Sequence, residues 1–340
     1  NINKVYPTPE QNELEGILQA NVTTNFDMNA IEKENYATIK NSGEIAVENF
    51  KYNSKEVANP FFIDKTSVSF NTNTIKLNEF KAKTGTSDIS VNGMLENFYG
   101  FIFKNEVLKG NFALNSTIFK VDDFLTSDTN ESEETTTTNS SLKIPAFLNC
   151  KFSANAKKVI YDNINLTNVT GDLYIHDETV DLKNLKSDIF GGKVAFNGKV
   201  STKEKTPNFN MNLDLKQLNI SESFNSLELL KSIAPIAKTI EGTFNSAINL
   251  AGNLKGDMTP DLQSITGDLL GELQNTKVTA SNSKMLSTLN NKTKFLNADK
   301  LNLNDLKGAF SFKNGIVNVI SMNINYKDVG VQVAGIHGVD

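Results

Sequence analysis

Two histidines are the side chains best suited to acid–base chemistry at neutral pH, and their sequence context argues against that role. His176 and His337 have no cysteine and no second histidine at the spacing of a metal site. No G-x-S-x-G sequence is available to position a nucleophilic serine. We therefore expect both histidines to be strand or turn residues, and we predict neither a catalytic site nor a metal site.

Acidic residues are plentiful, and a pair of them at a fixed separation could hydrolyse a glycosidic bond. Nothing in the sequence singles out such a pair. Glu131, Glu133 and Glu134 lie in a stretch without apolar residues, where burial cannot tune a pKa. Gly191-Gly192 belongs to no phosphate-binding pattern, and we interpret it as a tight turn or bulge. An enzyme is therefore the least favoured class, and we predict no cofactor.

The composition argues against several kinds of partner. The sequence has 340 residues, a formal net charge of -5 and 34 basic residues, all of which are lysine. Arginine supplies the bidentate fork that binds phosphate, so a chain without arginine or tryptophan is a poor candidate for nucleic-acid binding. Cys150 is the only cysteine, so no intrachain disulfide can form, and its apolar neighbours predict burial.

Short alternations of apolar and polar residues dominate the chain and predict strands with one buried face. Residues 209–215 (Phe-Asn-Met-Asn-Leu-Asp-Leu) are the clearest example. Asn-Gly pairs at 92–93, 197–198 and 314–315 predict turns between strands. We expect a mainly β fold, in which repeated antiparallel strand units form an elongated curved sheet or β-groove with a few short amphipathic helices.

The strand pattern repeats along the chain. Residues 164–198 align without a gap on residues 301–335, and a third copy lies upstream, where Ile75 corresponds to Val180 and Val317. Glycines at 93, 198 and 335 take the same place in the three copies. Repeated units of this kind stack so that each one buries the face of its neighbour.

The repeats place apolar side chains on one face of many strands. In a closed sandwich this face would be core, whereas in an open curved sheet it would form a trough for an apolar ligand. Periodicity leaves both arrangements open. The residues predicted to line this face are Ile75, Leu77, Ile89, Val91, Val180, Leu182, Val194, Phe196, Met211, Leu213, Leu215, Val317, Val319, Val331 and Val333.

Two segments carry apolar residues at three- and four-residue spacing, which predicts helices near residues 222–240 and 282–296 that cap the sheet. Residues 126–141 are acidic, rich in Ser and Thr and free of apolar residues, so we expect a mobile loop. We therefore divide the chain into a first β-repeat region over residues 1–125, this loop, and a second β-repeat region over residues 142–340.

Four segments of the second region resemble a known family. They are 188–198 (Asp-Ile-Phe-Gly-Gly-Lys-Val-Ala-Phe-Asn-Gly), 240–244 (Ile-Glu-Gly-Thr-Phe), 256–267 (Gly-Asp-Met-Thr-Pro-Asp-Leu-Gln-Ser-Ile-Thr-Gly) and 310–319 (Phe-Ser-Phe-Lys-Asn-Gly-Ile-Val-Asn-Val). Together they are similar to the C-terminal region of AsmA-like proteins, bacterial envelope proteins that include TamB-type relatives. The resemblance covers roughly residues 160–340 and rests on turns and strands, so it implies architecture more than activity.

The resemblance implies a periplasmic protein of a Gram-negative bacterium with a repeating β-groove that shields phospholipid acyl chains on their way to the outer membrane. No apolar run approaches the ~20 residues that span a bilayer, so we expect an inner-membrane anchor outside these residues. We predict a non-catalytic lipid-binding or lipid-transfer segment that supports outer-membrane homeostasis. The alternative is an assembly scaffold that binds envelope proteins through its sheet edges.

Overall fold

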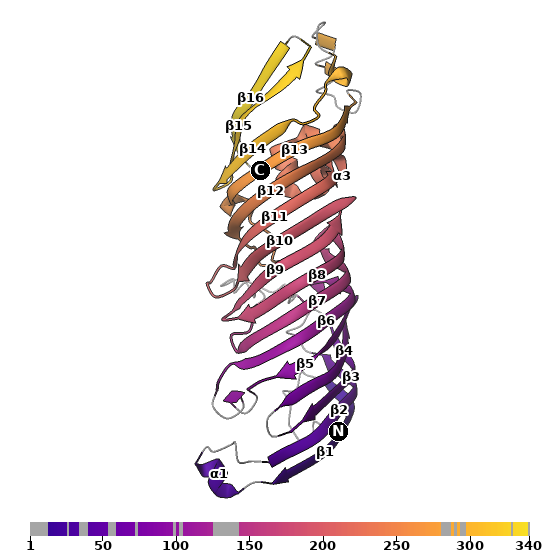
Figure 1. Cartoon of the computed structure of the whole chain (residues 1–340), viewed down its shortest axis with the longest axis vertical. Helices are drawn as coiled ribbons and strands as arrows, with labels where there is room; N and C mark the ends of the chain where they lie inside the picture. The colour runs from indigo at the N-terminus through magenta and orange to yellow at the C-terminus, as the bar shows by residue number, and fades with distance from the viewer. Residues whose placement is uncertain are drawn as a thin grey trace, which may run out of the picture. The chain divides into compact units, whose positions relative to one another are not determined.

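The described part of the chain is mainly β and forms one sheet of sixteen strands with a few short helices (Figure 1). The predicted fold class is therefore confirmed. The computed structural model describes residues 13–25, 27–33, 40–53, 59–71, 74–97, 100–101, 105–124, 143–279, 287–288, 291–292, 297–327 and 329–338.

The strands follow one another through the sheet in chain order, so that β1 and β16 are its edges. Their bounds are β1 (Glu13–Asn25), β2 (Lys40–Asn53), β3 (Phe61–Phe70), β4 (Ile75–Thr84), β5 (Ser87–Leu95), β6 (Leu108–Lys120), β7 (Leu148–Tyr161), β8 (Ile164–His176), β9 (Thr179–Ile189), β10 (Gly192–Ser201), β11 (Asn208–Asn219), β12 (Ile240–Asn253), β13 (Thr266–Val278), β14 (Lys307–Lys313), β15 (Ile316–Tyr326) and β16 (Val329–Gly338).

Strands β6 and β7 pair in parallel, in contrast to the antiparallel pair of β5 with β6 and to the antiparallel pairs at both ends of the sheet. Parallel neighbours need a long connection, because the chain must return to the same end of the sheet before the next strand begins. The residues between Lys120 and Leu148 supply this connection. They include the predicted loop at 126–141, which lies outside the described residues.

The chain divides into two compact units, which we describe separately. The first unit is Asn1–Asp162, Asn168–Lys183 and Ser201–Lys205, and the second is Asn163–Thr167, Asn184–Val200 and Thr206–Asp340. Strands β1 to β7 belong to the first unit and β11 to β16 to the second, while β8, β9 and β10 contribute residues to both.

A β-bulge recurs at one position of the repeat. The register shifts between Leu77 and Phe80 in β4, and between Val319 and Met322 in β15. At the corresponding place in β9, Asn184 has a φ of 53°. A bulge adds one residue to a strand and increases its local twist. Apolar residues before and after it stay on the same face, because the step across the bulge is three residues rather than two.

Two of the three Asn-Gly pairs are not turns. Residues 92–93 lie inside β5 and residues 197–198 inside β10, so these two turn predictions are wrong. The third pair, residues 314–315, joins β14 to β15 with φ values of 49° and 73°. Only this pair adopts the left-handed conformation that Asn and Gly favour in two-residue hairpin turns.

Inside β10 the two residues of the pair have separate structural roles. A Cβ at Gly198 would lie 2.8 Å from both the carbonyl oxygen of Asn210 and the side chain of Met211, so the neighbouring strand leaves room only for glycine. Asn197 faces the bulge of β9, where its Oδ1 accepts the backbone N–H of Asn184 at 2.8 Å. This bond satisfies an amide that the bulge removes from the regular ladder.

Three short helical segments follow β11 within the stretch 222–240 where the sequence predicts helix: α3 (Ile220–Ser226), α4 (Glu228–Ile233) and η4 (Pro235–Thr239). Asn219 caps α3, since its Oδ1 accepts the N–H of Glu222 at 2.8 Å. The helix predicted over 282–296 lies mostly outside the described residues. The other described helical segments are α1 (Met28–Glu32), η3 (Val121–Phe124), η5 (Leu262–Ser264) and η7 (Ala298–Lys300).

Candidate functional site: an apolar face in each unit

In the first unit, strand register aligns apolar side chains in rows that cross all seven strands from β1 to β7. The residues of each row point to the same face, because partners directly opposite in a sheet share a face. Three consecutive rows are Leu18–Val47–Thr66–Phe80–Val91–Leu114–Ala154, Ala20–Ile45–Val68–Leu77–Gly93–Phe112–Phe152 and Val22–Gly43–Phe70–Ile75–Leu95–Gly110–Cys150.

These rows make one continuous apolar face, which we call the first apolar face. The face crosses seven strands, and its six inter-strand gaps of ~4.8 Å give it a length of ~29 Å perpendicular to the strands. For comparison, the hydrocarbon layer of one membrane leaflet is ~15 Å thick. Stacked rings of Phe112 and Phe152, with centroids 5.2 Å apart, extend across the parallel pair. Burial raises the pKa of the Cys150 thiol in the third row, and this cysteine is 1% exposed.

In the second unit, the register of β11 to β16 builds an equivalent surface, the second apolar face. Two rows cross all six strands, with residues alternating in and out of the face along each strand. They are Leu213–Ile248–Leu269–Phe310–Val319–Gly335 and Met211–Leu250–Gly267–Phe312–Val317–His337. Beside them, Leu215 lies opposite Ser246, and Met322 lies opposite Val333.

Both faces keep solvent contact. Leu18 and Val22 at the edge of the first face are 55% and 49% exposed, and Val331 at the edge of the second is 43% exposed. Farther from the edges, Val91 and Leu213 are half-buried. The most buried members are Cys150 in the first face and Ile248, Leu269, Phe312 and Val317 in the second, and Val317 is fully buried. Within the described ranges every named strand belongs to the same sheet, so no second sheet packs over either face. The faces therefore differ from the core of a two-sheet sandwich.

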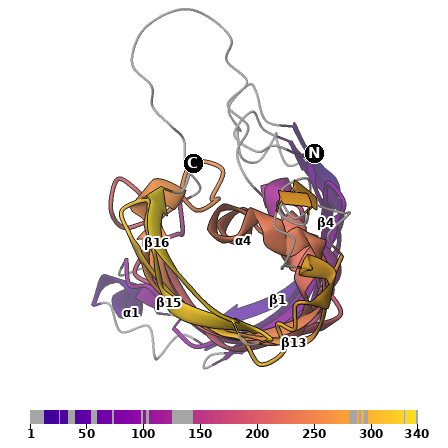
Figure 2. The same cartoon turned by 90° about the horizontal axis from the view of Figure 1, so that it is seen from above.

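One part of the second apolar face is covered by the helical segment 220–239. The rings of Phe224 in α3 and Phe244 in β12 meet edge to face, with centroids 5.8 Å apart. Leu218 and Ile220 at the start of this segment are fully buried. Figure 2 places α4 on the inner side of the curve followed by β13, β15 and β16. The segment thus closes the face over the ends of β11 and β12.

Strand register places most of the predicted lining residues on these faces. In the first unit the register places Ile75, Leu77, Ile89 and Val91 together on β4 and β5. Val180 and Leu182, also in the first unit, flank Asp181 on β9 and therefore lie on the face opposite to it.

In the second unit the register brings together Met211, Leu213, Leu215, Val317, Val319, Val331 and Val333. Two backbone contacts fix the position of β10: Gly192 lies against Gln217, and Gly198 lies against Met211. In the antiparallel register that these contacts imply, Val194 stands opposite Leu215 and Phe196 opposite Leu213, which adds both residues to the second face.

Several residues that complete the faces are not among the predicted lining residues, including Phe80, Met322 and the phenylalanines of β6, β7 and β14. Phe80 and Met322 follow the bulges, where the two-residue alternation breaks. An apolar residue at i, i+2 and i+5 in all three repeat copies is the signal that would have revealed the bulge. The phenylalanines of β6 and β7 lie outside the aligned repeat copies, so their place depends on strand pairing.

Among the residues that the structure describes, the titratable groups form no catalytic arrangement that can be identified by geometry. His176 Nε2 lies 3.1 Å from Asp181 Oδ2, and its ring stacks on Tyr174 with centroids 4.3 Å apart. His337 pairs in register with Val317 at the sheet edge. Among the described residues, no three His, Cys, Asp or Glu side chains gather to hold a metal ion. No helix in the same ranges is long and apolar enough to cross a membrane.

Comparisons of the chain with protein families, with curated proteins and with solved structures find no match.

Proposed function

We propose that the two apolar faces bind the acyl chains of lipids, and that the chain is a non-catalytic lipid-binding segment of a bacterial envelope protein. The observation that carries this proposal is the set of continuous apolar rows that retain solvent contact and have no second sheet over them. Monomeric proteins rarely leave contiguous apolar surface of this extent without a ligand or partner for it.

The energetics favour an acyl chain as that ligand. Each buried CH₂ contributes ~0.8 kcal/mol, so a ~16-carbon chain would gain on the order of 10 kcal/mol before the cost of ordering it. An apolar face needs no arginine to hold the chain, and the lipid headgroup can remain in solvent. This mode of binding suits a sequence whose basic residues are all lysine.

The resemblance to AsmA-like proteins extends the proposal to location and cargo. It supports a periplasmic segment that carries phospholipid toward the outer membrane, anchored through a part of the protein outside these residues. The proposed lipid binding itself does not depend on this resemblance, because it follows from the arrangement of the apolar rows.

A pair of charge insertions on opposite faces of β11 tests the proposal. Leu213→Glu places a carboxylate within the second apolar face. Asn212→Glu places the same charge at the neighbouring residue, which is exposed on the opposite face of the sheet. We expect native mass spectrometry of protein purified from bacterial membranes to detect phospholipid on the wild type and on Asn212→Glu. Leu213→Glu should lose most of it, because a carboxylate in an apolar face costs several kcal/mol.

The proposal fails if no preparation of the wild-type protein carries lipid, or if both variants carry as much as the wild type. Circular dichroism and thermal melting separate lost binding from lost folding. Should Leu213→Glu unfold, Val91→Glu and Asn92→Glu repeat the comparison in the first unit, where Val91 is half-buried and Asn92 is exposed.

A second candidate function, a scaffold that binds an extended strand of another envelope protein, is favoured by the edge strand β16. The aligned glycines of the repeat face a large side chain of the next strand: Phe112 beside Gly93, and Met211 beside Gly198. Gly335 has open space instead. Residues 329–338 also contain no lysine, acidic residue or proline, the usual protections of an exposed edge.

This candidate predicts a partner strand whose bulky apolar side chain fills the space beside Gly335. A photo-reactive residue in place of Ile336, which is 73% exposed, should then form a protein adduct in cells. Gly335→Lys should reduce the adduct without unfolding the chain, because its side chain enters open space. Adduct formation that is equal in both backgrounds would argue against pairing at this edge.

A further inference from the structure

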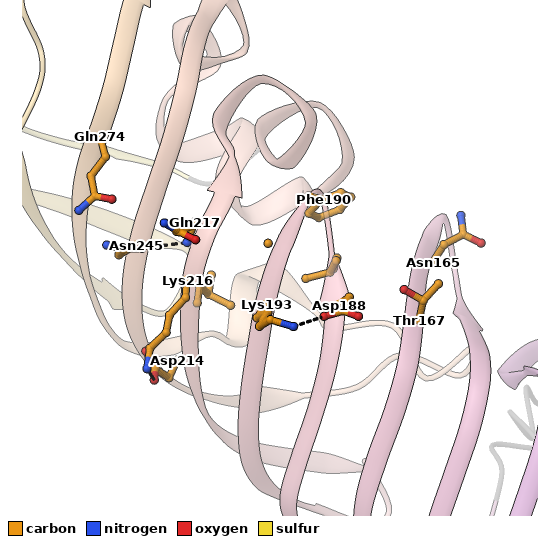
Figure 3. Close-up of a pocket in the computed structure, with 14 residues that line it drawn as sticks. Asn165, Thr167, Asp188, Phe190, Lys193, Asp214, Lys216, Gln217, Asn245 and Gln274 are labelled. Atoms are coloured by element: carbon orange, nitrogen blue, oxygen red, sulfur yellow. Dashed lines mark hydrogen bonds and ion pairs between the residues drawn. The ribbon is translucent and has the colours of Figure 1, made fainter.

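A cavity of about 910 Å³ lies within the second unit, lined by residues of six consecutive strands from β8 to β13 (Figure 3). Its volume falls within the ~300–1,000 Å³ of small-molecule sites. Asp214 and Lys216, which line it, alternate along β11 with Leu213 and Leu215. The charged side chains of the lining therefore lie on the polar face of the sheet, opposite the second apolar face. Leu215 and Ile189 also contribute to the lining.

The bulge in β11 shapes the floor of this cavity. Register with β12 shifts between Leu215 and Leu218, and Gln217 has a φ of 55°. The bulge leaves Lys216 and Gln217 exposed in succession on the cavity side. Asn245 Oδ1 accepts the N–H of Gln217 at 2.8 Å and fixes the bulged backbone. Bulges of this kind re-aim side chains and are frequent beside functional sites.

Close packing between β10 and β11 holds this floor in place. Gly192 has no room for a side chain, since a Cβ there would lie 2.6 Å from the carbonyl carbon of Gln217. The backbone of the hairpin before it is also fixed, because the carbonyl of Phe190 accepts the N–H of Asn219 at 2.9 Å. The polar groups of the cavity are therefore presented by a well-supported backbone, which lowers the cost of ordering them on binding.

The charges that line the cavity neutralise each other. Lys193 Nζ lies 2.8 Å from Asp188 Oδ1, and Lys216 Nζ lies 3.2 Å from Asp214 Oδ2. Two ammonium groups and two carboxylates leave a net charge of zero among the lining residues. A site for phosphate, a nucleotide or a metal cation would need an excess of one sign, so the balance favours an uncharged ligand.

The remaining polar groups are amides and a hydroxyl. Asn165, Gln217, Asn245 and Gln274 contribute amides from four different strands, and Thr167 contributes the hydroxyl. The side chains of Asn165, Thr167 and Gln274 make no hydrogen bond to any described residue, so their donors and acceptors are available. An amide offers donors and acceptors side by side, which matches adjacent sugar hydroxyls that both donate and accept.

We propose that this cavity of the second unit binds a neutral oligosaccharide. Amides spread over strands β8 to β13 would bond the sugar hydroxyls, and Phe190, the one aromatic residue of the lining, offers an apolar surface at the rim (Figure 3). The site is distinct from the acyl-chain site, because its amides and charged groups lie on the opposite face of the sheet. Its open, solvated side chains predict weak binding, with rapid exchange of the ligand.

Saturation-transfer difference NMR, which detects weakly bound ligands, tests the proposal with chitotriose, maltotriose, cellotriose and the anionic trigalacturonate as probes. We expect saturable binding of at least one neutral trisaccharide. In the double variant Asn165→Ala/Gln274→Ala its affinity should fall about tenfold or more, since hydrogen-bond partners are lost at both ends of the cavity. The matched control Asn212→Ala/Asn249→Ala removes two exposed amides of the same face outside the cavity and should bind as the wild type does.

Three results would overturn the proposal: no saturable signal from any neutral trisaccharide, tighter binding of trigalacturonate, or equal affinity in the cavity and control variants. Melting temperatures of both double variants accompany the binding data. If the cavity variant does not fold, Thr167→Ala and Gln274→Ala are measured singly against the same probes and control.

Discussion

Asp123 lies where the turn between β4 and β5 meets the helical segment η3, and its carboxylate is largely buried. The carboxylate accepts hydrogen bonds from the backbone N–H of Thr86 at 2.8 Å, from its hydroxyl at 3.0 Å, and from the hydroxyl of Ser87 at 2.8 Å. Burial alone would raise the pKa of Asp123, but the bonds from Ser87 and Thr86 outweigh it and hold the pKa below the usual 3.8.

Because the folded-state pKa lies below the unfolded value, the ionised carboxylate stabilises the fold above a pH of about 4, and this contribution is lost as the pH falls through the folded-state pKa. We predict that Asp123→Asn lowers the free energy of unfolding by ~1–3 kcal/mol at neutral pH, since a neutral amide oxygen accepts these hydrogen bonds more weakly than an ionised carboxylate does. The deficit should shrink in urea titrations below pH ~4. Asp122→Asn, at an exposed neighbour, should change stability by less than ~1 kcal/mol. Equal stability of Asp123→Asn and wild type at neutral pH would contradict this account.

The repeat glycines provide a second comparison at single residues. A Cβ at Gly93 would overlap the carbonyl oxygen of Asn111 and the backbone of Phe112, whereas a Cβ at Gly335 would meet nothing within 4 Å. We predict that Gly93→Ala destabilises the protein by ~1–3 kcal/mol through forced backbone shifts. Gly335→Ala should be neutral or slightly stabilising, because it restricts the unfolded chain without a clash. Thermal unfolding of the two variants measures the difference, and equal costs would contradict the strand register.

At the scale of elements, the bulges are the feature that organises the strands. Amides released at several bulges are capped by a side chain of a neighbouring strand, as Asn197 caps Asn184 and Asn245 caps Gln217. These amides would otherwise lack a partner in the ladder. The alternation that identified the strands could not reveal the bulges, because it tests one residue spacing. The sequence likewise predicts a turn at Asn197-Gly198, because the hydrogen-bond partner of Asn197 lies on another strand.

Removal of one cap should loosen its hairpin. We predict that Asn197→Ala lowers the free energy of unfolding by ~0.5–1.5 kcal/mol, the net contribution of one partly solvated hydrogen bond. Asn197→Asp keeps the acceptor oxygen and should retain most of the stability. Urea denaturation of the three proteins gives the comparison, and a loss in Asn197→Asp equal to that in Asn197→Ala would argue against the capping role.

The helical segment 220–239 depends on its contact with the sheet, since its helices are too short to be stable alone. We predict that Phe224→Ala costs ~1–3 kcal/mol through lost burial against Phe244. Amide hydrogen exchange should accelerate within residues 220–239 while β12 and β13 stay protected. Phe62→Ala, at a ring that is 44% exposed, should leave exchange in this segment unchanged. Unchanged exchange in Phe224→Ala would mean that the ring contact does not hold the segment.

For the whole molecule, the sequence predicted a mainly β chain and the positions where apolar residues recur, because both follow from local alternation. It could not predict the parallel pairing of β6 with β7, which depends on how the chain returns after Lys120. Carboxylates and histidines stand out in a sequence as candidate catalytic groups, whereas the amides of Asn165 and Gln274 do not. Those amides are scattered in the chain, and only the order of strands β8 to β13 brings them to one cavity.

The most direct test of lipid binding places a photo-reactive amino acid at single positions on the two sides of the sheet. Val91 and Leu213 lie on the apolar faces, and Asn92 and Asn212 lie beside them on the polar side. After irradiation with phospholipid vesicles, we predict lipid adducts at positions 91 and 213 and few at 92 and 212. Absence of adducts at the apolar positions, or equal labelling on both sides, would contradict the acyl-chain proposal.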